Sequence, residues 1–301
     1  MRISAHAAAT HAGRKRRHNE DAYVERPPLF AIADGMGGAR AGEVASRLAA
    51  AALEDNGVAA GAPEERVVEL IQEANRRVFE RAHEDASASG MGTTMTVAIV
   101  DDGGVTIGHV GDSRAYRLRD GALQQLTDDH SLVAELVRSG RLTPEEADAH
   151  PQRSVITRAV GTDPDVDVDA FTVAAEPGDV YLLCSDGLTD MLDDGGIRSV
   201  FEAHPDDLHA AAKGLVNAAN RVGGDDNITV VCFAMDDDVP QGDTVVGIDA
   251  PTEEDTLHGM AALDAPTAVA PPEEERRGLF APALLGAAVA AIGVLVWLVL
   301  R

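Results

Sequence analysis

Cysteine and aromatic residues are scarce in this sequence of 301 residues. Its two cysteines, Cys184 and Cys232, each lie inside a short apolar run, so we expect both to be buried and reduced rather than joined in a disulfide or part of a zinc site. Aromatic residues make up 3% of the chain, whereas apolar residues as a whole make up 45%. The chain is therefore long enough to bury one sizeable core, and alanine, valine, leucine and isoleucine must fill it.

Basic residues are also few. The 25 lysines and arginines are outnumbered by 51 aspartates and glutamates, which gives a formal net charge of −26. A nucleic-acid-binding surface needs charge of the opposite sign, so we expect no nucleic-acid partner. An acidic surface serves solubility, which accounts for most of the surplus, and bound metal could neutralise a part of it.

Several familiar catalytic motifs are missing as well. The glycine-rich turn that follows Asp34 has Arg40 at the third glycine position of a dinucleotide-binding loop, and an aspartate before such a turn would repel a pyrophosphate. The sequence contains no P-loop, zinc-protease helix, nucleophile elbow or cysteine-nucleophile arrangement. Of the catalytic chemistries considered, metal-assisted chemistry is the one that the sequence leaves open.

The two termini differ in hydrophobicity. The segment Met1–His6 lacks the apolar centre of a signal peptide, so we expect the bulk of the protein in the cytoplasm. At the other end, Leu279–Leu300 contains 22 uncharged residues, which as a helix would span roughly 33 Å and cross a bilayer. A buried core helix is the alternative, but the segment is apolar on all faces. Arg276 and Arg277 precede it, which favours a single-pass anchor in the inner membrane at 278–301, with the catalytic part in the cytoplasm.

Short apolar runs alternate with helical patterns over residues 1–236. Strands are predicted at Leu29–Ala33, Thr94–Val100, Val105–His109, Ala115–Leu118, Val180–Cys184 and Ile228–Phe233. Helices are predicted at Gly42–Asp55, Glu64–Glu84, Ser131–Ser139, Glu145–Ala149 and Leu208–Val222. Adjacent strand runs separated by helices indicate an α+β fold. Residues 237–277 are acidic, contain proline and lack periodicity, so we expect a disordered linker there.

Three acidic turns lie far apart in the sequence. Asp34 follows the apolar run Leu29–Ala33, Asp186 follows another apolar run, and Asp226 precedes a third. If the fold brings these carboxylates together they must repel one another, unless a divalent cation holds them. The sequence therefore indicates a metal site.

A cluster of cations precedes two acids near the N-terminus. The segment Arg14–His18 is followed by Asn19-Glu20-Asp21 in an otherwise acidic chain. A solvated surface is the preferred interpretation of Arg14, Lys15 and Arg17, whereas one arginine is expected to bind phosphate.

The order of these motifs resembles the bacterial protein phosphatase 2C (PP2C, or PPM) family of metal-dependent protein serine/threonine phosphatases. The motifs are Arg-x-x-Asn-Glu-Asp, Ala-Asp-Gly-Met-Gly-Gly, Gly-Met-Gly-Thr-Thr, Gly-Asp-Ser-Arg, Ser-Asp-Gly-Leu and Asp-Asn-Ile-Thr-Val. The resemblance covers residues 1–236 and implies a β-sandwich of two antiparallel sheets flanked by helices. A dinuclear Mn²⁺ or Mg²⁺ centre is implied at one end of it.

The resemblance also implies the roles of individual residues. It assigns Asp34 as the carboxylate that bridges both metals and the Gly35 carbonyl as a ligand of one of them. Asp186 and Asp226 would complete the other site. Arg16, five residues before Asp21 in this sequence, would bind the phosphate.

Further positions are implied around this centre. Asp112 of the Gly-Asp-Ser-Arg turn would hold a third, weaker metal, with Ser154 as a possible contributor, although a plain turn is the alternative at Asp112. Glu20, Asp21 and Asn227 would lie just outside the metals. The insertion 129–161 matches the mobile flap of the family.

Met36 stands where some relatives, chiefly eukaryotic ones, have a histidine that acts as general acid. Methionine cannot donate a proton, so the leaving group would be protonated by water or another group. The implied activity is hydrolysis of phosphoserine and phosphothreonine in proteins by a water that the metals activate.

The expected partners are phosphorylated proteins, namely serine/threonine kinases and their substrates, at the membrane. Two alternatives stay open at this point. One is a non-catalytic pseudophosphatase that binds phosphoproteins, and the other is a phosphatase of a sigma-factor partner-switching pathway.

Overall fold

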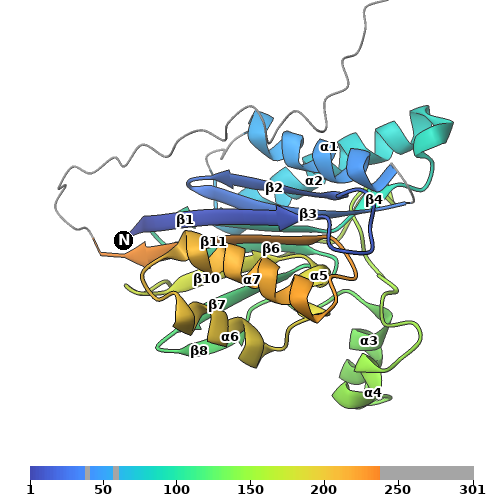
Figure 1. Cartoon of the computed structure of the whole chain (residues 1–301). Helices are drawn as coiled ribbons and strands as arrows, with labels where there is room; N and C mark the ends of the chain where they lie inside the picture. Colours follow the sequence, from blue (N-terminus) through green and yellow to red (C-terminus); the bar gives the residue numbers. More distant parts are fainter. Residues whose placement is uncertain (38–40, 57–60, 238–301) are drawn as a thin grey trace, which may run out of the picture. The chain divides into compact units, whose positions relative to one another are not determined.

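The computed structural model describes residues 1–37, 41–56 and 61–237. Two antiparallel β-sheets form the centre of this part (Figure 1). The first sheet has the strand order β1 (Arg2–His11), β11 (Ile228–Asp236), β10 (Val180–Cys184), β7 (Arg114–Arg119) and β8 (Ala122–Gln125). The second has the order β2 (Asp21–Arg26), β3 (Leu29–Met36), β5 (Met95–Asp101), β6 (Gly104–Val110) and β9 (Asp169–Val173), with β4 (Gly92–Thr93) paired to β3.

Aromatic side chains gather between the two sheets. Phe30 of β3 stacks on Phe233 of β11 with ring centroids 4.4 Å apart, and Tyr181 of β10 stacks on Phe233 at 5.1 Å. All three side chains are fully buried, and such stacks add to the stability gained by burial. Aliphatic residues still make up most of this layer, as expected, and the three aromatic rings pack among them.

Helices cover the outer face of each sheet (Figure 1). α1 (Ala41–Asn56) and α2 (Pro63–Glu84) pack on the second sheet, and α6 (Asp194–Ala203) and α7 (Leu208–Val222) pack on the first. The predicted α+β class and the two flanked antiparallel sheets are thus confirmed.

The pattern of α2 shows why the sequence predicts this helix well. Pro63 occupies its first turn, where a missing N–H leaves no donor unpaired, and Glu64 and Glu65 add negative charge near the positive end of the helix dipole. Its inward face carries buried residues at helical spacing, among them Val67, Ile71, Ala74 and Val78.

Other elements escaped the sequence pattern. β1 is built largely from alanine, histidine and threonine and buries only Ala7, so it lacks the alternation that marks a strand. α6 begins with Gly195 and Gly196, which are poor helix formers, and it depends instead on the Asp193 cap and on buried Ile197 and Phe201. β2, β4, β8, β9 and α5 (Asp186–Thr189) are equally short or irregular and were also missed.

The insertion after β8 contains two short helices, α3 (Leu132–Arg138) and α4 (Pro144–Asp148). In Figure 1 they lie beyond the edge of the two sheets. Ser131 caps α3 and Thr143 forms a capping box with Glu146 at α4. Because the caps are local, the sequence predicts both helices to within a residue at each end.

The two cysteines are buried and reduced, as the sequence predicts. Cys184 and Cys232 are both free thiols with no exposed surface, on neighbouring strands of the first sheet. Burial raises the pKa of the Cys184 thiol to about 12, which keeps it protonated and unreactive at neutral pH.

No helix among the described residues is long and apolar enough to cross a bilayer. The expected membrane segment 278–301 and the linker 237–277 lie outside the described residues, apart from Asp237. The domain boundary at residue 236 therefore stays a prediction.

Candidate metal centre

Five aspartates from separate segments of the chain lie at one end of the two sheets. Asp21 at the start of β2 is the register partner of Asp34 near the end of β3. Burial raises the pKa of Asp34 well above its ordinary value, and the neighbouring charges raise it further. Those charges belong to Asp21, Asp186, Asp112 and Asp226. The fold therefore brings the predicted carboxylates close enough to repel one another.

The backbone of Asp34 is held firmly by two threonines. Its N–H donates to Thr94 Oγ1 at 3.0 Å, and its carbonyl accepts from the Thr94 N–H at 2.9 Å and from Thr93 Oγ1 at 2.8 Å. These bonds fix the end of β3 on the segment that leads from β4 into β5. They leave the carboxylate of Asp34 as the part of the residue that faces the acidic cluster.

The turn after Asp34 packs so closely that only glycine fits. A Cβ on Gly35 would lie 2.0 Å from the carbonyl oxygen of Gly42 in α1, and a Cβ on Gly42 would lie 2.6 Å from the Gly35 carbonyl oxygen. The Gly35 N–H also donates to the Glu20 carbonyl at 3.2 Å. The glycines therefore bring the start of α1, the end of β3 and the segment before β2 together.

Among the described residues at this end of the molecule, the carboxylate of Asp21 is the clearest example of a buried acidic group that lacks a cationic partner. One carboxylate oxygen accepts hydrogen bonds from Ser185 Oγ at 3.0 Å and Thr229 Oγ1 at 2.5 Å, but the other is buried with no hydrogen-bond partner among the described residues. Burial raises the pKa of Asp21 to about 6. One carboxylate oxygen of Asp186 is likewise buried and unpartnered, and burial raises the pKa of Asp186 well above its ordinary value. Orphaned buried carboxylate oxygens are rare in folded proteins, and hard divalent cations prefer such ligands.

The described residues do not enclose a metal as they stand. No three histidine, cysteine, aspartate or glutamate side chains within the described ranges converge tightly enough to hold an ion. The chemistry of the donor set nevertheless fits a divalent cation, because several buried carboxylates repel one another and two of their oxygens have no hydrogen-bond partner among the described residues. The ligand roles of the individual residues stay predictions.

Among the described residues, Asp226 has an ion-pair partner, whereas Asp34 and Asp186 have none. Arg16 Nη2 lies 2.6 Å from one oxygen of Asp226, and the other oxygen accepts the Asn227 N–H at 2.8 Å. The side chain of Asn227 in turn accepts from the Glu20 N–H at 2.7 Å and donates to the His18 carbonyl at 3.0 Å. These contacts place the predicted phosphate-binding arginine directly at the acidic cluster.

The other basic residues of the loop between β1 and β2 are exposed, as predicted from the sequence. Arg14, Lys15 and Arg17 are all exposed, and Lys15 pairs with Asp225 at 2.6 Å. The backbone N–H of Arg14 donates to the Gly224 carbonyl at 2.6 Å. Backbone contacts thus fix the loop, while its basic side chains remain in solvent.

Asp112, the predicted third-metal ligand, lies just after β6 and is only 9% exposed. Burial raises its pKa to about 6, and the charges of Asp129 and Asp190 raise it further. Ser154 is exposed and lines the same cavity as Asp112 and Asp186, but no contact joins it to Asp112 in the described structure.

Asp190 is an acidic residue of this end that the sequence interpretation missed. It ends α5 four residues after Asp186, and its charge helps to raise the pKa of Asp186 and of Asp112. Asp186 and Asp190 are four residues apart, which is about one helical turn, and this spacing is the sequence feature that could have placed Asp190 beside Asp186. A helix of four residues is too short to show a periodic pattern, so this signal was weak.

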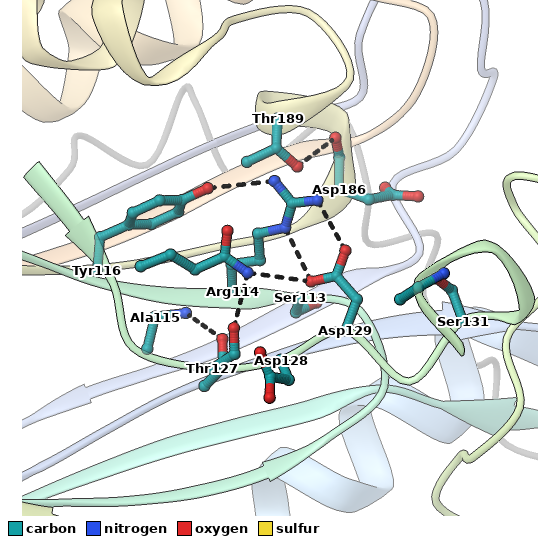
Figure 2. Close-up of polar contacts among 12 residues, drawn as sticks. Ser113, Arg114, Ala115, Tyr116, Thr127, Asp128, Asp129, Ser131, Asp186 and Thr189 are labelled. Atoms are coloured by element: carbon teal, nitrogen blue, oxygen red, sulfur yellow. Dashed lines mark hydrogen bonds and ion pairs between the residues drawn. The ribbon is translucent and has the colours of Figure 1, made fainter. Parts of the chain in front are cut away.

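An ion pair between Arg114 and Asp129, shown in Figure 2, anchors the insertion to the first sheet. Arg114 in β7 donates to both oxygens of Asp129, at 2.8 and 2.7 Å, and to the Tyr116 hydroxyl at 3.2 Å. His130 adds a reciprocal pair with Gly111, because its N–H donates to the Gly111 carbonyl at 2.7 Å and its Nδ1 accepts the Gly111 N–H at 3.0 Å. The insertion therefore begins at a fixed position next to the Asp112 turn.

A cavity of about 1200 Å³ opens beside these residues. Asp112 and Asp186 line it at the acidic cluster, α3 and α4 of the insertion line another side, and the segment from Thr189 to Gly195 lines a third. The acidic cluster is therefore accessible from a cavity large enough for part of a polypeptide.

Comparisons with known proteins agree with this geometry. A family model described as "Protein phosphatase 2C" matches residues 10–216. The serine/threonine phosphatase stp of Listeria innocua is 40% identical over 233 residues, which cover 74% of this chain and 92% of that protein.

Two solved structures are also similar. The PPM serine/threonine phosphatase MsPP of Mycobacterium smegmatis, in complex with cacodylate, has 41% identity and a TM-score of 0.70 over 77% of this chain and 99% of that one. The catalytic domain of the serine/threonine protein phosphatase PstP, in complex with 2 manganese ions, has 37% identity and a TM-score of 0.70 over 77% of this chain and 98% of that one.

Proposed function

The chain belongs to the protein phosphatase 2C family and is a protein serine/threonine phosphatase, and on that premise we propose that it hydrolyses phosphoserine and phosphothreonine with a pair of divalent metal ions. Mn²⁺ or Mg²⁺ is the proposed cofactor, and the PstP structure with 2 manganese ions supports this choice. The observation that carries the proposal is the set of buried, mutually repelling carboxylates, two of which have an oxygen with no hydrogen-bond partner in the described part of the chain.

Each proposed ligand has a place in this scheme. Asp34 would bridge the two ions, the Gly35 carbonyl would bind one of them, and Asp186 and Asp226 would bind the other. Asp112 would hold a third ion, with Ser154 nearby on the same cavity. Bound there, the ions would act as Lewis acids that lower the pKa of water and so supply the nucleophile.

The chain's own residues would position the phosphate. Arg16 is bound to Asp226 in this structure, and its guanidinium can donate two parallel hydrogen bonds to non-bridging phosphate oxygens. This contact would neutralise charge on the phosphoryl group as the ester bond breaks. Glu20, Asp21 and Asn227 would hold the surrounding loops, as their hydrogen bonds indicate.

The leaving serine or threonine oxygen needs a proton. Met36 lies two residues after Asp34 and has no proton to donate. We therefore assign this proton to water.

The membrane location is a separate part of the proposal. The apolar segment 279–300 would anchor the phosphatase to the inner membrane with its catalytic part in the cytoplasm, near serine/threonine kinases and their substrates. Fractionation of cells that express the full chain tests this, since recovery of all the protein in the soluble fraction would contradict it.

A hydrolysis assay tests the catalytic part of the proposal. Wild-type protein and Asp34→Asn are compared on para-nitrophenyl phosphate and on a phosphothreonine peptide, with and without Mn²⁺. We expect turnover only for the wild type with metal. Turnover that persists in excess EDTA would overturn the metal scheme, and binding of phosphopeptide without turnover would instead indicate a pseudophosphatase.

A further inference from the structure

The helix α3 presents an apolar face that the described structure covers only in part. Its sequence is Leu-Val-Ala-Glu-Leu-Val-Arg, yet none of its 7 residues is buried in the described chain. Val133, Ala134 and Val137 line the cavity beside Asp112 and Asp186. A helix with this many apolar residues normally buries them, so the cavity-facing side of α3 is suited to a further segment of polypeptide.

The opposite wall of the same cavity is acidic. Besides Asp112 and Asp186, the lining of the cavity as a whole carries five carboxylates against three guanidinium groups, and they belong to Asp128, Asp129, Asp190, Asp193, Asp194, Arg114, Arg138 and Arg153. Arg114 is already paired with Asp129, and Arg153 lies 3.7 Å from Asp190.

The remaining carboxylates are available to a ligand. Asp128 and Asp194 are exposed and have no ion-pair partner among the described residues. Asp193 accepts the Gly196 N–H at 2.8 Å as the cap of α6 and has no ion-pair partner among the described residues. Within the described chain, Arg138 is the only unpaired cation that lines this cavity. The cavity lining therefore has a negative net charge.

We propose that this cavity binds the polypeptide that flanks the phosphorylated residue, and that it selects substrates with basic and apolar side chains there. The inference rests on the proposed phosphatase function. Asp186 and Asp112 of the acidic cluster line this cavity, so a phosphoresidue bound at the metal centre would place its neighbours next to it. Arginine or lysine would meet Asp193 and Asp194, and a leucine-like side chain would pack on Val137.

A pair of phosphothreonine peptides tests the charge preference. One carries arginine and leucine on both sides of the phosphothreonine, and the other has glutamate in place of each arginine. With Mn²⁺ present, we expect kcat/KM to favour the arginine peptide about fivefold at low salt, and the preference to shrink as salt is added. The ratio of the two kcat/KM values does not depend on the fraction of active enzyme.

Two double variants of this chain, one in the cavity and one outside it, test whether the cavity aspartates cause the difference in kcat/KM between the two peptides. Asp193→Asn combined with Asp194→Asn removes two charges from the cavity, and asparagine still caps α6. Asp206→Asn combined with Asp207→Asn makes the same change at the start of α7, where Asp207 accepts the Ala210 N–H at 2.9 Å and neither residue lines the cavity. We expect the first variant to reduce the preference below about twofold and the second to leave it as in the wild type.

Three results would count against the inference. A wild type that treats both peptides alike, or prefers glutamate, would overturn it, and the latter would point to the exposed cations at Arg14 and Arg17. A preference that survives in Asp193→Asn/Asp194→Asn would overturn it too. Failure to hydrolyse either peptide or para-nitrophenyl phosphate with Mn²⁺ would overturn the proposed function itself, and this inference with it.

The apolar side of the cavity has its own variant. Val137→Thr keeps the shape of the side chain but adds a hydroxyl to the face of α3. We expect it to lower kcat/KM for the leucine-containing peptide relative to a serine-containing one by about threefold. If the ratio of the two kcat/KM values did not change, α3 would not be part of the binding site, which would contradict the proposal for the apolar side of the cavity.

Discussion

The two ends of β10 carry aspartates in opposite surroundings. Asp179, just before the strand, is fully buried and receives two hydrogen bonds of 2.7 Å from Arg119 and one of 2.8 Å from the Glu176 N–H. Asp186, just after the strand, has one oxygen buried without a partner and lies among other carboxylates. A single strand of five residues therefore separates a satisfied carboxylate from an unsatisfied one.

The difference appears in the direction of each pKa shift. Burial alone would raise the pKa of Asp179, but the Arg119 guanidinium outweighs it and holds the pKa below its ordinary value. At Asp186 burial raises the pKa, and the charges of Asp112, Asp190 and Asp226 raise it further. The Asp179 end is thus complete without a ligand, whereas the Asp186 end is complete only with a cation.

The largest expected effect is on catalysis at the unsatisfied end. Asp34→Asn and Asp226→Asn should each lower Mn²⁺-dependent hydrolysis of para-nitrophenyl phosphate on the order of a thousandfold, because each removes a proposed ligand.

The same Asp34→Asn variant should be more stable than the wild type without metal, by about 1 kcal/mol in urea unfolding, because it removes a repelling charge. Loss of activity together with loss of stability would instead indicate a structural role for Asp34.

At the satisfied end the expected effect is on stability. Asp179→Asn should lower the free energy of unfolding by about 3 kcal/mol, because it leaves the Arg119 guanidinium without its charged partner. Urea unfolding measures this, and kcat with Mn²⁺ should stay near the wild-type value. A large loss of kcat would show that the two ends of β10 are not independent.

Arg16 allows a smaller test of the unsatisfied end. Arg16→Ala should raise KM for a phosphopeptide about tenfold or more, because it removes charge-assisted hydrogen bonds to the phosphate. Arg17→Ala is the matched control, since Arg17 is adjacent and exposed. Equal effects of the two substitutions would contradict a specific role for Arg16.

The smallest expected effect is a dependence of metal stabilisation on pH. Asp21 and Asp112 have pKa values raised to about 6, so the folded, metal-free protein holds these protons more tightly than the unfolded chain does. Its stability should therefore fall as pH rises from about 4, the ordinary value, through about 6. Asp179, whose pKa is lowered, contributes stability above about pH 4 that is lost as pH falls below it.

Bound Mn²⁺ would replace those protons, so it should raise Tm by several degrees more at pH 7.5 than at pH 5. Differential scanning calorimetry at the two pH values checks this. An equal rise at both values would show that the buried carboxyl groups do not compete with the metal for protons.

The sequence predicted most of the inner strands, because runs such as Leu29–Ala33 and Val180–Cys184 are short, apolar and bounded by turn residues, whereas the sandwich of two sheets was implied by the resemblance to the protein phosphatase 2C family. It failed on β1 and α6, where tertiary contacts outweigh weak local preferences. The stacking of Phe30 on Phe233 could not be predicted either, since nothing local relates residues so far apart in the sequence.

At the candidate site the sequence located the acidic turns but not their surroundings. Asp34, Asp186 and Asp226 stand beside glycine or asparagine, which marks them as turn residues. The hydroxyl groups of Ser185 and Thr229 on Asp21, and the ion pair of Arg114 with Asp129, join segments that are distant in the chain. Only the folded structure shows those contacts.

Titration calorimetry with Mn²⁺ tests the central claim most directly, namely that the carboxylates beyond β10 form a metal centre. Wild-type protein and Asp179→Asn should each bind a pair of ions at pH 7.5, whereas Asp34→Asn should lose at least one of them. A wild type that binds no Mn²⁺, or an Asp34→Asn variant that binds it as the wild type does, would contradict the account.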